Sequence, residues 1–137
     1  MNWTLEVVCV PVSDVDAAKE FYWAQLGFAV DHDTTIGADN RIVQLTPPGS
    51  GCSICIGTAV VAMPPGSMQG LQLVVPDIRK AHAELTARGV DAGEVQVYAR
   101  DGLRPAVDGD ELNNVGFLHF TDPDGNGWAV QQITARS

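Results

Sequence analysis

Two stretches of the chain share one order of apolar and polar positions, which predicts the same elements twice. Each begins with an apolar run, "VVCVPV" or "LQLVV", and an aspartate follows, Asp14 or Asp77. Apolar residues then recur at helical spacing until a glycine, Gly27 or Gly89. Aspartate is a favoured helix N-cap, and glycine is favoured just past a helix end. We therefore predict a strand and a capped amphipathic helix in each half.

Three strands are predicted after each helix, separated by turns rich in glycine, proline, aspartate and asparagine. The expected strands are residues 28–32, 41–46 and 52–57 in the first half, and 94–98, 115–121 and 127–134 in the second.

The expected fold class is therefore α+β, with two tandem βαβββ modules in a single domain of residues 1–137. Module one covers about residues 3–58 and module two about residues 69–135, with a linker at about 59–68. A module of about 60 residues buries too little apolar surface to be stable alone, so we expect the two to fold together.

The charge of the chain limits the kinds of partner that it is expected to bind. The formal net charge is −9, from 17 acidic and 8 basic residues. Such a chain repels phosphate backbones and anionic lipids, so we expect neither a nucleic acid nor a membrane partner. The start, "MNWTLEVVCV", lacks the basic region of a signal peptide, and we expect a cytoplasmic protein.

Three cysteines, Cys9, Cys52 and Cys55, indicate reduced thiols rather than a disulfide framework. The "CSIC" spacing of Cys52 and Cys55 matches a C-x-x-C motif. Positions i and i+3 of a strand point to opposite faces, however, so we do not expect a thioredoxin-like redox pair.

Three segments carry a family resemblance: "VSDVDAAKEFYWAQLGF", "VVPDIRKAHAELTARGV" and "FTDPDGNGWAVQQI". With them the chain resembles the vicinal oxygen chelate superfamily from Val7 to Ile133. That group includes glyoxalases, extradiol dioxygenases, fosfomycin-inactivating enzymes and bleomycin-resistance binding proteins. The resemblance implies paired βαβββ modules that curl into a cup, a divalent metal in many members, and a homodimer.

The resemblance also implies where the metal ligands would stand. In the family, the first and last strands of each module each supply one. These positions fall on Val7, Ser53, Gly70 and Ala129 of this chain. Divalent metals take Cys, His or carboxylate ligands, or several oxygens. We therefore predict a cup without the metal site of the family, and no cofactor, while a divalent metal held by other ligands stays the disfavoured alternative.

One position further along the same rows, two thiols and two amides face the cup. They belong to Cys9, Cys55, Gln72 and Gln131. Two thiolates would suit a soft metal, but we favour buried apolar cysteines and amides that hydrogen-bond a ligand. Strand alternation then predicts a ligand-binding set of Val7, Cys9, Ser53, Cys55, Gln72, Phe117, Ala129 and Gln131.

The catalytic candidates are His119, Tyr98 and Glu111. His119 alternates with Phe117, and the pattern leaves open whether this pair or Leu118 faces the cup. Glu111 lies in the segment 99–114, the longest stretch without clear periodicity. A loop of that length is a candidate lid, and a carboxylate there is a candidate general base.

Three functions fit this sequence. The first is a homodimeric, metal-free binding protein of the bleomycin-resistance type for a small organic molecule. The second is a metal-independent lyase or isomerase that uses His119 or lid carboxylates. The third is a metal-dependent glyoxalase-like lyase or dioxygenase with unusual ligands.

Overall fold

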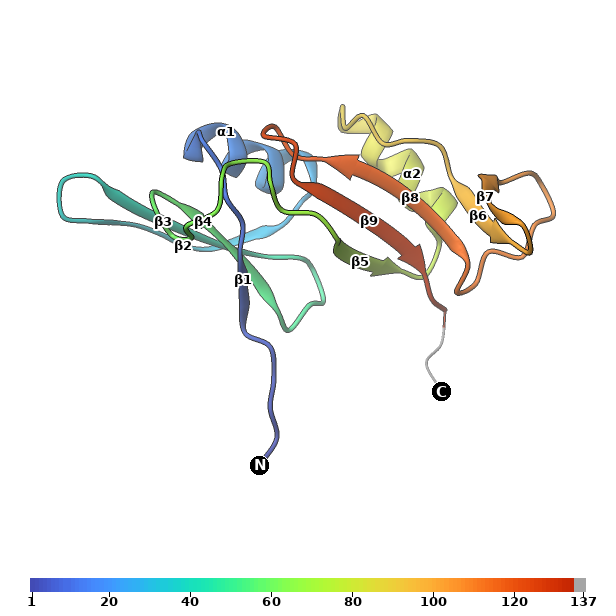
Figure 1. The fold of residues 1–137 in the computed structure, drawn as a ribbon, viewed down its shortest axis with the longest axis horizontal. Helices are drawn as coiled ribbons and strands as arrows, with labels where there is room; N and C mark the ends of the chain where they lie inside the picture. Colours follow the sequence, from blue (N-terminus) through green and yellow to red (C-terminus); the bar gives the residue numbers. More distant parts are fainter. Residues whose placement is uncertain (135–137) are drawn as a thin grey trace. The chain divides into compact units, whose positions relative to one another are not determined.

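The computed structural model of the chain describes residues 1–134. Its contacts divide the chain into two compact units (Figure 1). Unit one holds residues 1–68 together with the turn at 122–126, and unit two holds residues 69–121 and those from Gly127 onward. Each unit contains one sheet and one helical segment, so the repeated order predicted from the sequence is confirmed.

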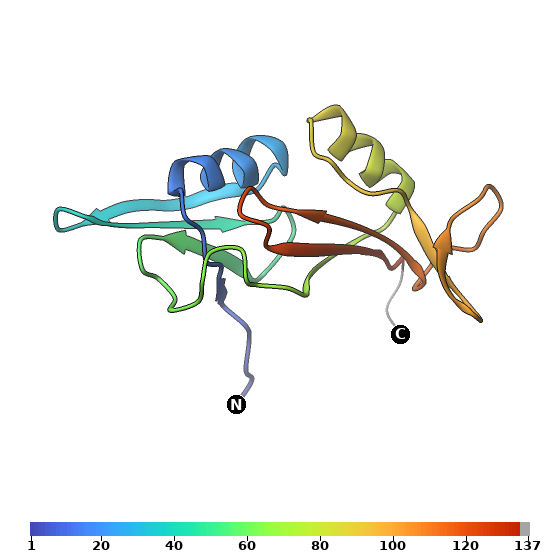
Figure 2. The same cartoon turned by 45° about the horizontal axis from the view of Figure 1, so that its top comes forward.

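The sheet of unit one has four strands in the order β1-β4-β3-β2. Strand β1 runs parallel to β4, and the other neighbours are antiparallel. Figure 2 shows the helical segment of this unit lying along one face of the sheet, where it contacts β3 and β4. The strands are β1 (Val7–Cys9), β2 (Ala29–Ile36), β3 (Asn40–Thr46) and β4 (Ser53–Gly57).

The helical segment of unit one begins as α1 (Val15–Glu20) and continues as a π-helical turn, η1 (Phe21–Gln25). Asp14 caps it, since its carboxylate accepts from the Ala17 N–H over 3.0 Å. Gly27 follows with a φ of 80°, the left-handed conformation in which only glycine avoids a Cβ penalty. The predicted caps are thus confirmed, whereas the sequence pattern gave no sign of the π-helical turn.

Strands and helical segment together supply the core of unit one. Ile54 and Ile56 of β4 are buried, but so are Ser53 and Cys55, so this strand shows no alternation in burial. The buried apolar side chains of this unit are Val10, Ala18, Phe21, Tyr22, Leu26, Phe28, Val43, Leu45, Ile54, Cys55 and Ile56.

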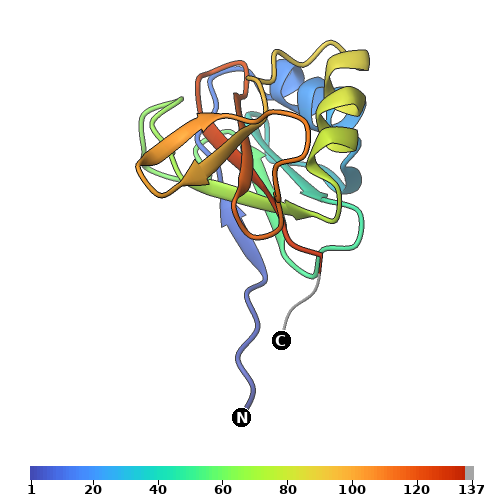
Figure 3. The same cartoon turned by 90° about the vertical axis from the view of Figure 1, so that its right-hand side faces the viewer.

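Unit two repeats the plan with one more strand. Its sheet order is β5-β9-β8-β6-β7, and β5 runs parallel to β9. Figure 3 shows the added hairpin of β6 and β7 in orange. The strands are β5 (Leu71–Val75), β6 (Gln96–Ala99), β7 (Gly102–Pro105), β8 (Gly116–Thr121) and β9 (Gly127–Gln132).

Helix α2 (Ile78–Ala87) contacts β8 and β9 and buries one face of the second sheet. Asp77 caps it through the Lys80 N–H at 3.1 Å, and Gly89 ends it with a φ of 81°. The buried apolar residues of this unit are Ile78, Val90, Val97, Leu112, Leu118, Phe120, Trp128 and Val130.

Two sequence expectations need correction. Strand β2 runs to Ile36 rather than ending at residue 32, so His32 lies within a strand beside a bulge and not near its end. Strand β7 occupies part of the segment 99–114 that lacked periodicity. Its four residues are mostly exposed, and an exposed strand of that length has no apolar face to reveal it.

Among residues 1–134, no helix has the length and apolar character needed to cross a membrane.

Candidate functional site

One face of the second sheet is not covered by α2, and we call it the open face of unit two. The register aligns Gln72 and His119 on either side of Ala129, in one row across three strands. The next row aligns Val74, Gln131, Phe117 and Gln96. Leu118 and Phe120 lie on the opposite face and are buried. The alternative that the sequence left open is thereby decided, because Phe117 and His119 share the face of Ala129.

Two glutamine amides are joined at the centre of this face. The side-chain amide of Gln72 donates to the Gln131 carbonyl oxygen over 2.6 Å, and Gln131 donates to the backbone carbonyl of Asn114 over 2.8 Å. The chain of hydrogen bonds fixes the orientation of both amides. Each amide keeps further hydrogen-bonding capacity for a bound molecule.

Aromatic rings form a second group on the same face. The rings of Tyr98 and Phe117 meet edge to face with centroids 5.3 Å apart, while those of Phe117 and His119 lie nearly parallel at 6.5 Å. Tyr98 is 53% exposed. The Phe117 ring contacts both other rings, so two of the three catalytic candidates, Tyr98 and His119, flank it. Glu111 is separate from this group and accepts a hydrogen bond from the Asn113 N–H over 2.9 Å.

A hollow of about 430 Å³ opens beside His119 and Ala129. Gly70 borders it, and a Cβ built on that glycine would meet no atom within 4 Å. Glycine and alanine therefore leave room for a ligand at the two positions where the resemblance implies metal ligands in module two. The hollow is lined by Gln69, Gly70, Asp91, His119, Phe120, Thr121, Gly127, Trp128 and Ala129.

The face of the first sheet turned away from α1, which we call the open face of unit one, carries small polar side chains, and Ser53 and Cys55 on it are buried. Val7 is paired with Ser53, and Cys9 with Cys55, across β1 and β4. The Ser53 hydroxyl lies 2.6 Å from that of Thr46, which in turn donates to the carboxylate of Asp31. Burial, together with the neighbouring Cys9 thiol, raises the pKa of the Cys55 thiol.

The segment 99–114, a candidate lid, is held by specific contacts. Arg104 forms a two-pronged ion pair with Asp110 at 2.9 Å for each bond, and Arg79 of α2 donates to the Val107 carbonyl at 2.8 Å. The Arg104 guanidinium and the Val107 N–H hold the pKa of Asp110 well below its usual range. A carboxylate so paired is a poor general base, which removes Asp110 as a candidate.

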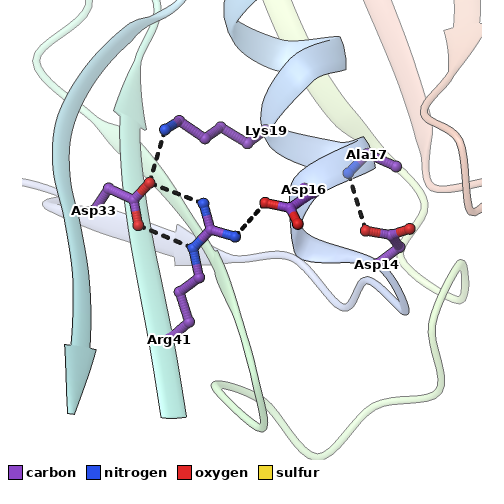
Figure 4. Close-up of polar contacts among 6 residues, drawn as sticks. All are labelled: Asp14, Asp16, Ala17, Lys19, Asp33 and Arg41. Carbon is purple, nitrogen blue, oxygen red and sulfur yellow. Dashed lines mark hydrogen bonds and ion pairs between the residues drawn. The ribbon is translucent and has the colours of Figure 1, made fainter. Parts of the chain in front are cut away.

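A second hollow, of about 500 Å³, lies on unit one beside Trp23, Lys19 and Arg41. Its cations are already paired (Figure 4). Asp33 accepts from Lys19 over 2.7 Å and from two nitrogens of Arg41 over 2.9 and 3.0 Å, while Arg41 also donates to Asp16. These hydrogen bonds, that of Arg41 first, hold the pKa of Asp33 well below its usual range. We read this cluster as structural.

The residues at the implied metal positions do not fit a divalent ion. Val7, Gly70 and Ala129 have no donor atom in their side chains, and Ser53 offers one hydroxyl that already bonds Thr46. Across residues 1–134 there is no group of three or more His, Cys, Asp or Glu side chains placed to hold a metal.

Comparison with known proteins identifies the family of the chain. The model of the Glyoxalase/Bleomycin resistance protein/Dioxygenase superfamily matches residues 4–130. The chain belongs to this superfamily. Its α+β fold is that of solved superfamily members. No curated protein matches the chain.

Three solved structures illustrate the similarity. TnmS3, an antibiotic binding protein from Streptomyces sp. CB03234, is 30% identical, with 96% of this chain and 97% of that one covered and a TM-score of 0.74. A glyoxalase/bleomycin resistance protein from the same organism is 30% identical, with 94% and 100% covered and a TM-score of 0.71. A superfamily member from Sphaerobacter thermophilus DSM 20745 is 26% identical, with 96% and 98% covered and a TM-score of 0.73.

The structure shows residues at the candidate site that the sequence analysis did not single out. Asp91 and Gln69 line the hollow, although both lie outside strands, where alternation gives no signal. Gln96 joins the open face through the register of β6 with β8. Its place in the alternation was visible, but the side chain carried no chemistry that singled it out.

Proposed function

We propose that this superfamily member binds a small organic molecule on the open faces of its sheets, without a divalent metal. One observation carries the proposal: the hollow beside Gly70 and Ala129, where the resemblance implies chelating side chains, is lined by His119, whose ring lies against that of Phe117. A ligand can then fill the space that a metal and its ligands would otherwise take. The 30% identity to an antibiotic binding protein supports a ligand-binding role.

The chemistry of the face suggests what the ligand looks like. Phe117 offers an aromatic surface on which a flat ring can stack, and the amides of Gln72 and Gln131 offer hydrogen bonds to polar substituents. The net charge of −9 favours a cationic ligand through long-range attraction. We therefore expect a flat aromatic molecule with polar groups and a positive charge.

Each open face has its own proposed binding residues. From the open face of unit one we include Val7, Cys9, Ser53 and Cys55, and from that of unit two Gln72, Phe117, Ala129 and Gln131. We further propose that the protein acts as a cytoplasmic homodimer, in keeping with the family resemblance.

A second candidate function is a metal-independent lyase or isomerase. The observation that favours it is that His119 and Asp91, two titratable groups, line the same hollow. His119 would act as the base on a bound ligand, because an imidazole nitrogen can accept a proton. Tyr98 lies on the other side of the Phe117 ring and would at most contact the ligand.

The binding proposal is tested by titrating the metal-stripped protein with an anthracycline, a fluorescent cationic polycyclic aromatic, and with bleomycin. Saturable binding of at least one probe to protein kept in EDTA is the expected result. Binding that appears only after a divalent metal is added would contradict the proposal. Unaltered probe on mass analysis after binding separates a binding protein from the lyase or isomerase alternative.

A further inference from the structure

Cys9 and Cys55 are direct neighbours on the parallel strands β1 and β4. They are paired in the register of these strands, and the Val10 N–H donates to the Cys55 carbonyl over 2.9 Å. Partners in a parallel pair point to the same face, so both thiols project from the open face of unit one. Both are free cysteines, with Cys55 9% exposed and Cys9 half-buried.

The strand spacing suits a metal bridge between the two thiols. Side chains that project in parallel from neighbouring strands keep about the 4.8 Å spacing of those strands. A metal bound linearly between two sulfurs, at about 2.3 Å for each bond as in zinc thiolates, would span about 4.6 Å. The two sulfurs can therefore hold one ion with little movement of either strand.

The number of ligands selects the metal. Within residues 1–134, Cys9 and Cys55 have no third His, Cys, Asp or Glu side chain grouped with them to hold an ion. Structural zinc takes four ligands, and magnesium and calcium take oxygens. Cu(I) is soft, prefers thiolates and accepts two ligands. We propose that Cys9 and Cys55 form a two-coordinate site for Cu(I), a soft monovalent cation.

Binding exchanges protons and leaves the oxidation state unchanged. Two S–H bonds break, two S–Cu bonds form, and two protons pass to the solvent, while copper stays Cu(I). The partial burial of both thiols limits the approach of further ligands and so favours the low coordination number.

The test is an anaerobic titration of the reduced protein with Cu(I) in competition with the chelator bathocuproine disulfonate. We expect one Cu(I) per chain. Loss of a residue that only supports a metal ligand weakens binding by up to about 100-fold. Cys9→Ser and Cys55→Ser remove a ligand itself, so each should weaken Cu(I) binding by more than that. Cys52→Ser is the matched control, because the register gives Cys52 no cysteine partner, and it should bind as the wild type does.

Cys9→Ala provides a second variant at the more exposed position, in case serine disturbs the buried strand, and circular dichroism verifies the fold of each variant. Wild-type affinity in Cys9→Ala or Cys55→Ser would overturn the proposal, as would loss of binding in Cys52→Ser. Displacement of Cu(I) by an equal concentration of Zn²⁺ would overturn the two-coordinate assignment. Cys9 and Cys55 also belong to the proposed ligand-binding set, but this titration contains no organic probe, so its outcome reports on Cu(I) binding alone.

Discussion

The phenol of Tyr22 donates a 2.7 Å hydrogen bond to the carboxylate of Asp122, which lies 100 residues further along the chain. Both residues are buried in unit one. Asp122 also accepts from the side-chain amide of Asn126 and from the N–H groups of Asp124 and Asn126. The carboxylate therefore organises the Asp-Pro-Asp-Gly-Asn turn and ties it to the helical segment of this unit.

Tyr22→Phe should destabilise the protein, because it leaves a buried carboxylate oxygen with one hydrogen bond fewer. A hydrogen bond to a charged group contributes about 1.5–3 kcal/mol. We expect a loss of that size in the free energy of unfolding, measured by urea denaturation. Tyr98→Phe is the matched control, because the Tyr98 side chain is largely exposed. Equal stability of the Tyr22→Phe variant and the wild type would show that the bond contributes nothing.

The ion cluster of Asp33, Lys19 and Arg41 predicts a pH dependence. The pKa of Asp33 in the folded state lies below its ordinary value of 3.8. The carboxylate therefore contributes stability above that value, and the contribution is lost as the pH falls toward the folded pKa. Asp33→Asn should cost about 1 kcal/mol at pH 7, a figure reduced for solvent screening of a partly exposed cluster.

Denaturation curves at several pH values check this prediction. The stability difference between wild type and Asp33→Asn should shrink below about pH 4 and also at high salt. Asp39→Asn, a change at an exposed turn aspartate, should show neither effect. A difference that stays constant from pH 7 to pH 3 would argue against the ion pairs as its cause.

Phe117 is predicted to be the main stacking surface for the ligand. Phe117→Ala should weaken probe binding roughly tenfold, since an aromatic contact contributes about 0.5–1.5 kcal/mol beyond the area it buries. Trp23→Ala removes another exposed ring, but one on the helical segment of unit one, and should leave the affinity unchanged. Fluorescence titration measures the affinity of both variants for the probe. Equal losses of affinity would contradict the proposal that the ligand binds on the open face of unit two.

The hollow should accept a metal site if ligands are restored. Gly70→His and Ala129→Glu together would place an imidazole and a carboxylate beside His119, at positions that line one cavity. Three such ligands suit Zn²⁺. The double variant should bind one Zn²⁺ per chain in isothermal titration calorimetry, in the background of Cys9→Ser to exclude the thiols. Gly70 has a φ of 88°, which strains any side chain there, so circular dichroism verifies the fold of the double variant first. Failure of the folded variant to bind would mean that these positions do not converge as the hollow suggests.

The sequence predicted much of the fold because several signals agreed. Asp14 and Asp77 cap the helices, and Gly27 and Gly89 end them, as local chemistry requires. Strand alternation also assigned Ala129 correctly to the uncovered face, since Trp128 and Val130 are buried on the other. Signals of this kind depend on near neighbours in the chain.

The missing parts depend on distant contacts. Strand β7 exists through pairing with β6, and β2 is extended by pairing with β3, although most of its side chains are exposed. Asp91 reaches the hollow through a loop that neither propensity nor alternation describes. The face of His119 was ambiguous from its own strand and was decided by its pairing with Ala129.

Titration of the wild-type protein with Mn²⁺, followed by electron paramagnetic resonance of the free ion, tests whether the protein binds its ligand without a divalent metal. Mn²⁺ prefers oxygen ligands and avoids thiols, so it reports on a metal site of the family type and not on the cysteine pair. We expect all added Mn²⁺ to stay free while an organic probe still binds. One tightly bound Mn²⁺ per chain, required for probe binding, would contradict it.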